Sequence, residues 1–184
     1  MSRVNLIWKP NKTSPKLPSV VYGTYFSVEN EGLRGCLLFK VCNNNHHLFK
    51  FPVLCFSVDG KIRVIDFDLS IPSYGFRKFE VGIKIKRLIT TFDSRSIHII
   101  HLLNCCNTTR DCVYIYQKEG SPEPSFVVPV FDKDGHRKTS PNSDVEGSLF
   151  YYYVDLNSGN IIKLESTDTF IPVEVHIEIV EKED

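Results

Sequence analysis

The side chains best suited to metal chemistry gather near the middle of the chain. His98 and His101 are followed by Cys105, Cys106 and Cys112, and all five are ordinary zinc-ligand types. Structural zinc sites usually present cysteines as C-x2-C pairs, and the chain has no such pair. The two histidines would also point to opposite faces of a strand. The sequence therefore predicts no metal site.

An acidic run later in the chain resembles the middle of a calcium-binding EF-hand loop. If Gly135 of Asp132–Gly135 takes the sixth loop position, Val130 takes the first ligand position and Pro141 the last. Neither residue has a carboxylate, and no helical pattern flanks the run. The run is therefore predicted to be a turn.

Catalytic signatures are missing. The chain has no Gly-x-Ser-x-Gly elbow, no cysteine-protease motif and no glycine-rich phosphate-binding loop. Asp66 and Asp68 point the same way on a predicted strand and are candidates for an acid pair, but a solvated strand face explains them as well. We therefore predict a protein that is not an enzyme and takes no cofactor. A hydrolase that uses Cys and His from loops is the third-ranked alternative.

Positive charge is the strongest functional lead. Three lysines of the stretch 78–86 share one parity, while the other parity holds Phe79, Val81, Ile83 and Ile85, so burial of these apolar side chains turns the lysines outward together. Two cations repeat the pattern on a second stretch. We predict a basic face that holds phosphates without reading sequence, made of Lys61, Arg63, Lys78, Lys84 and Lys86. The competing interpretation is a solvated face whose lysines discourage edge pairing.

Alternating and β-branched stretches predict strands along most of the chain. The stretch 79–86 alternates strictly and 97–103 is apolar almost throughout, so the region 76–103 is predicted to form a long central hairpin. Asp59-Gly60 and the segment 157–160 lie between apolar runs, which predicts two further hairpins. Other strands are predicted at 20–28, 35–42, 48–58, 61–69, 112–117, 126–131, 149–156, 161–165 and 173–180. Pro129 predicts that 126–131 is an edge strand.

The composition also favours a β fold. Alanine is absent and the only methionine is Met1, while the chain contains 13 Phe and 8 Tyr. We predict an all-β protein, an antiparallel β-sandwich or partly open barrel of about ten short strands with little or no helix. Residues 1–18 contain prolines and cations but no acid, which predicts a flexible basic arm. Residues 19–181 are predicted to form a single β domain with a mobile loop at 132–147.

The compartment is predicted from the first residues and the cysteines. The N-terminal residues lack the apolar core of a signal peptide, and no apolar run is long enough to span a bilayer. A cytoplasmic protein that is not secreted is therefore expected, with its six cysteines as reduced thiols. Cys55 alternates in phase with apolar neighbours and is predicted to be a core residue.

The two halves of the chain carry opposite charge. Residues 1–110 contain 16 Lys/Arg and 7 Asp/Glu, and residues 111–184 contain 6 and 15. Such a split can drive head-to-tail self-association or aim a basic face at an acidic partner. Alternatively, both halves interleave in one domain and their fields cancel.

These observations lead to a ranked set of functions. The leading hypothesis is a non-enzymatic surface-binding protein that self-associates into a homo-oligomer and contacts nucleic acid or an anionic membrane face. The alternative is a cytosolic protein–protein adaptor. The alanine-free composition is typical of AT-rich coding sequences, and with the size, β pattern and charge split it fits a small viral matrix-like or accessory protein.

Overall fold

The computed structural model describes residues 3–9, 25–42, 48–67, 76–89, 111–117, 120–165 and 170–181. The predicted all-β class is confirmed: these ranges are mostly strand, and their only helical element is a short 3-10 segment, Glu31–Leu33. The strands are β1 (Val4–Lys9), β2 (Tyr25–Ser27), β3 (Leu37–Lys40), β4 (Pro52–Phe56), β5 (Ile62–Asp66), β6 (Arg77–Leu88), β7 (Val113–Tyr116), β8 (Ser125–Pro129), β9 (Thr139–Pro141), β10 (Leu149–Asp155), β11 (Ile161–Glu165) and β12 (Phe170–Glu181).

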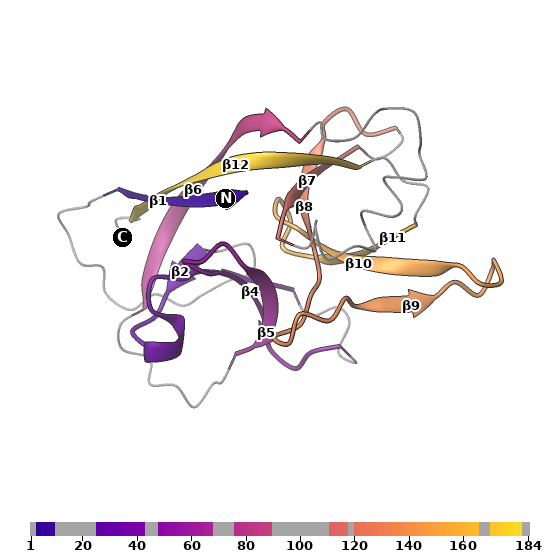
Figure 1. The fold of residues 1–184 in the computed structure, drawn as a ribbon, viewed down its shortest axis with the longest axis horizontal. Coiled ribbons are helices and arrows are strands. Elements are labelled where there is room, and N and C mark those ends of the chain that lie inside the picture. Colours follow the sequence, from indigo (N-terminus) through magenta and orange to yellow (C-terminus); the bar gives the residue numbers. More distant parts are fainter. Residues whose placement is uncertain are drawn as a thin grey trace.

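All twelve strands belong to one open sheet that curls on itself (Figure 1). Its path runs β11-β10-β8-β7-β12-β6-β2-β3-β4-β5, while β1 pairs with β12 and β9 with β10. The pairing of β1 with β12 is parallel and the other described strand pairings are antiparallel. Figure 1 shows yellow β12 crossing the top of the view toward β7, with purple β2, β4 and β5 below it and orange β9 and β10 at the right.

Two long strands form the centre of the sheet. β6 and β12 are twelve residues each and lie antiparallel, with Ile83 opposite Ile177. Their alternating pattern places one apolar set on the inner face, as the sequence predicts. β6 also pairs with β2 through Arg77–Phe79. The predicted hairpin partner, residues 97–103, lies outside the described ranges.

The main core fills the inside of the curl. It joins side chains of β3, β4 and β5 to side chains of β7, β8, β10 and β12 in one cluster, including Leu37, Phe39, Leu54, Ile62, Val64, Val113, Val128, Tyr152, Val173 and Ile177. The amide of Val64 on β5 donates to the carbonyl of Phe131 at 2.7 Å. The end strand of the path is thereby tied to the segment after β8, which gives part of this edge a hydrogen-bond partner.

Two smaller apolar clusters lie on the outer side of the sheet, because alternate residues point away from the main core. The first contains Cys112, Tyr114, Tyr116, Val127, Tyr151, Tyr153, Leu164 and Phe170. The second contains Phe26, Val28, Cys36, Leu38, Val53, Cys55 and Phe67. Between them, the outer side of β6 and β12 carries mostly charged and polar side chains.

Part of the predicted flexible arm is a strand in the structure. Val4–Lys9 forms β1, parallel to β12 with Leu6 beside Ile177. Val4 is buried in the main core and Leu6 packs against it, so this burial stabilises the strand. Residues 10–18 lie outside the described ranges, and for them the arm stays a prediction.

The structure confirms the two predicted hairpin turns, but the strand predicted at 126–131 is not at an edge of the sheet. β4 and β5 are antiparallel neighbours on either side of Asp59-Gly60, and β10 and β11 flank the turn that holds Gly159. Gly60 and Gly159 have positive φ angles of 82° and 78°, which favour glycine. β8, however, lies between β7 and β10 and is not an edge strand, and Pro129 is its last residue.

The segment predicted as a mobile loop contains regular structure. Thr139–Pro141 within 132–147 forms β9 and pairs with β10. The run Asp132–Gly135 is a turn, as predicted, with the amide of Gly135 donating to the carbonyl of Asp132 at 2.9 Å. The mobility of this segment stays a prediction.

Candidate functional site

The lysines of the predicted basic face on β6 are paired with carboxylates of β12. Lys84 Nζ lies 2.9 Å from Glu178 Oε1, and Lys86 Nζ lies 3.2 Å from Glu174 Oε1. Arg87 Nε donates to the other oxygen of Glu174. These cross-strand pairs form because the register sets basic β6 against acidic β12 on the outer side of the sheet.

Glu174 is the centre of this arrangement. Its side chain is only 7% exposed, whereas the side chains of Lys86 and Arg87 are more than half exposed above it. The hydrogen bond from Arg87 lowers the pKa of the Glu174 carboxyl, and Lys86 lowers the pKa further against the opposing effect of burial. Glu174 is therefore a carboxylate held in place by two cations.

This lowered pKa predicts a specific pH dependence of stability. Since the pKa is lower in the folded than in the unfolded protein, ionised Glu174 stabilises the fold above its unfolded pKa, and this stabilisation is lost as pH falls through the folded pKa. Urea unfolding from about pH 7 to about pH 3 should therefore show a shallower loss of stability for Glu174→Gln than for the unaltered protein. Parallel pH profiles would contradict this role.

The pairing nearly cancels the charge of the central strands. β6 and β12 together carry five cations (Arg77, Lys78, Lys84, Lys86, Arg87) and four carboxylates (Glu80, Glu174, Glu178, Glu181), a net charge of one. The two oppositely charged halves of the sequence therefore interleave at this point. A surface that binds polyanions usually has a clear excess of positive charge, and these two strands have little.

Arg63 is a structural residue rather than a surface cation. Its side chain is 12% exposed, and its Nη1 donates to Asp111 and to the carbonyl of Ile62. The same oxygen of Asp111 accepts the amide hydrogen of Ile62 at 3.0 Å. Arg63 and Asp111 therefore tie β5 to the residues just before β7.

The five predicted basic residues do not form one patch. Lys61 pairs with Asp59 at 3.3 Å, both largely exposed, in the β4–β5 turn. β5 lies four strands from β6 along the sheet, about 19 Å at the usual strand spacing. The register row that joins Lys78 to Arg63 passes through buried Phe26, Leu38 and Cys55. Of the five, Lys78 alone has no carboxylate partner in the described ranges.

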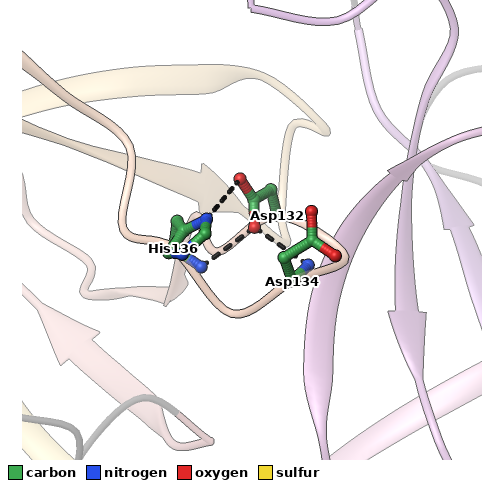
Figure 2. A group of neighbouring side chains, drawn as sticks. All are labelled: Asp132, Asp134 and His136. Atoms are coloured by element: carbon green, nitrogen blue, oxygen red, sulfur yellow. Dashed lines mark hydrogen bonds and ion pairs between the residues drawn. The ribbon is translucent and has the colours of Figure 1, made fainter.

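The turn after β8 carries side chains of the kinds that bind metal ions. Asp132, Asp134 and His136 each offer one possible ligand atom, and these atoms lie within 4.8 Å of one another. Figure 2 shows the three residues side by side on the turn. Asp132 is already occupied, however: its Oδ1 accepts the amide hydrogens of Asp134 (3.0 Å) and His136 (2.9 Å), and Lys138 lies 3.3 Å from its Oδ2. These contacts lower the pKa of Asp132 in spite of burial, and the carboxylate stabilises the turn.

One member of the candidate acid pair, Asp66, lies in the described ranges and has a structural role. Oδ1 of Asp66 accepts the amide hydrogens of Lys50 at 2.7 Å and Phe51 at 3.0 Å. This carboxylate therefore accepts two backbone amide hydrogens just before β4 and fixes the chain at the start of that strand. Asp68, the other member of the pair, lies outside the described ranges.

The described cysteines, Cys36, Cys42, Cys55 and Cys112, are thiols. Cys55 is buried in the sheet, as predicted, and burial together with the neighbouring Cys36 raises its pKa. Burial likewise raises the pKa of Cys112 to about 11, and its Sγ lies within hydrogen-bond distance of the carbonyl oxygens of Val113 (3.3 Å) and Val173 (3.6 Å). The other residues of the zinc-type group, at 98, 101, 105 and 106, lie outside the described ranges.

Burial and a raised pKa predict that the Cys55 thiol is alkylated slowly. Alkylation of the native protein, mapped by mass spectrometry, should modify Cys55 orders of magnitude more slowly than the half-buried Cys42, because reaction requires a thiolate and an opening of the sheet. In urea the two rates should converge. Equal rates in the native protein would contradict the burial of Cys55.

On the outer side of β10, an arginine is surrounded by aromatic rings, a cluster that was not predicted from the sequence. The guanidinium carbon of Arg137 lies 4.6 Å from the ring centroid of Tyr153, 5.2 Å from that of Phe131 and 5.3 Å from that of Tyr151. Such contacts contribute about 2 kcal/mol when desolvated. The alternation of Tyr151 and Tyr153 was visible in the sequence, but Arg137 lies in the segment predicted as a loop.

Comparison of the chain with protein-family models, with curated proteins and with solved structures found no match. In the described ranges, no helix has the length and apolar character needed to cross a membrane.

Proposed function

We propose that the protein is a non-enzymatic binding domain and that its partner is another protein, either a second copy of the chain or a different one. The observation that carries the proposal is the compensation of the β6 cations by Glu174 and Glu178. Protein interfaces tolerate paired charges, whereas nucleic acids and anionic membranes are attracted by uncompensated ones. The viral matrix-like role stays a prediction from composition.

The surface that we propose for this contact is the outer face of β1, β12 and β6. Its apolar members, Ile7 and Val180, are each more than a third exposed. Register places Ile7 beside Glu178 on one side and Gly82 beside Glu178 on the other. Exposed apolar side chains among paired charges are what a protein partner can cover.

Gly82 offers a way to block this face without damage to the fold. A Cβ added at Gly82 would meet no atom within 4 Å, and glycine inside a strand costs about 0.5–1 kcal/mol. Gly82→Tyr should therefore leave the free energy of unfolding unchanged or raise it by about 0.5–1 kcal/mol. It should also abolish capture of the partner in quantitative pull-downs, or dimerisation in sedimentation experiments if the partner is a second copy.

The matched control is Arg34→Tyr, which adds the same ring at another exposed position. It should leave partner capture intact, and nuclease treatment should not change the result. Capture that survives Gly82→Tyr, or that disappears with nuclease, would overturn the proposal.

A further inference from the structure

The guanidinium nitrogens of Arg137 are buried, and within the described part of the chain they have no hydrogen-bond acceptor. Each of its three side-chain nitrogens exposes less than 1 Å², and none has a hydrogen-bond partner among the described residues. The rings of Phe131, Tyr151 and Tyr153 surround the guanidinium and are themselves almost fully buried. Aromatic faces attract the positive charge, but they do not accept hydrogen bonds as an oxygen does.

The nearby carboxylates in the described ranges are paired with other cations and do not accept from Arg137. The ring of Phe131 also contacts Arg63, whose guanidinium carbon lies 6.0 Å from the ring centroid, but Asp111 neutralises that arginine. The adjacent Lys138 already pairs with Asp132. Arginine does not lose its proton in proteins, so this buried charge and its five N–H donors require an oxygen partner.

We propose that Arg137 binds an oxyanion, the carboxylate or phosphate group of a small molecule, in a site walled by Phe131, Tyr151 and Tyr153. The planar fork of the guanidinium presents two parallel N–H groups to two oxygens of such a group. The nitrogens are covered, so binding of the anion requires the residues around the guanidinium to move aside. This site lies outside the proposed protein-binding face and does not depend on it.

Thermal unfolding of the full chain in phosphate, sulfate and acetate, each against chloride at equal ionic strength, tests the site. At least one oxyanion should raise Tm with a saturable dependence, as expected when a ligand binds only the folded state. Arg137→Met should lose the saturable shift, while Arg34→Met, at an exposed arginine, should keep it. A saturable shift in acetate would indicate a carboxylate site. A saturable shift in phosphate or sulfate would indicate a site for a tetrahedral oxyanion.

Two further measurements cover the case in which Arg137→Met does not fold. Arg137→Lys keeps the charge but loses the fork, and it should raise the Kd for the anion about tenfold. In protein with 15N-labelled arginine, one Nε–H resonance should move on titration with the anion, and Arg137→Lys should remove that resonance. The absence of a saturable shift with all three anions, or an equal shift in Arg137→Met or Arg137→Lys, would overturn the proposal.

Discussion

Replacement of Asp111 by alanine should destabilise the protein by about 3 kcal/mol. The change leaves the mostly buried Arg63 without its carboxylate, and breaking a buried pair by removal of one partner typically costs about 3–5 kcal/mol. It also removes the acceptor of the Ile62 amide on β5. The lower end of the range is expected because Asp111 itself is about one-third exposed.

Urea unfolding measures this effect, with Lys61→Ala as the control on the other side of Ile62. Lys61 forms an exposed pair with Asp59, so its loss should change the free energy of unfolding by no more than about 0.5 kcal/mol. If the two variants were destabilised equally, the structural role assigned to Arg63 and Asp111 would be wrong.

Replacement of Glu174 and Glu178 by glutamine should strengthen the binding of phosphate groups to the outer face of β6 and β12. The double variant keeps the shape of both side chains and releases Lys84, Lys86 and Arg87 from their partners. Its affinity for single-stranded RNA should rise about tenfold or more at low salt. The slope of log K against log salt should become steeper by about two, as expected for three new phosphate contacts.

The matched control for this variant is Glu31→Gln with Glu146→Gln. Both residues are exposed, and their replacement changes the net charge by the same amount at other places. An equal gain of RNA binding in the control would mean that overall charge, and not the pairing on β12, limits the affinity.

The fold class could be predicted because the strongest signals are local. Strict alternation in β6 and β12 and the Asp59-Gly60 turn each follow from residues close together in the sequence. Parity also correctly turns Lys84 and Lys86 to the outer side. Within the sheet, strands far apart in sequence are neighbours, and single-sequence patterns do not encode that order.

The ion pairs of the basic residues could not be predicted for the same reason, because their partners are far away in the sequence. Glu174 lies 87 residues from Arg87, and Asp111 lies 48 residues from Arg63, so only the tertiary fold brings each pair together. β1 escaped prediction because its parallel partner is the last strand of the chain. The three rings around Arg137 likewise come together only when β10 pairs with β9, Val130 bonds to Tyr152 of β10, and Phe131 forms a bridge with Arg137.

Binding of the unaltered protein to single-stranded RNA and to anionic liposomes, measured across a range of salt concentrations, tests most directly whether the central strands are built for a polyanion. Compensation of the β6 cations predicts weak binding with little salt dependence, at an affinity no better than ordinary non-specific binding of about 10⁻⁴–10⁻⁶ M. Tight binding that falls steeply with salt and is lost in Lys84→Glu with Lys86→Glu would contradict it. That result would restore the basic face as the functional surface.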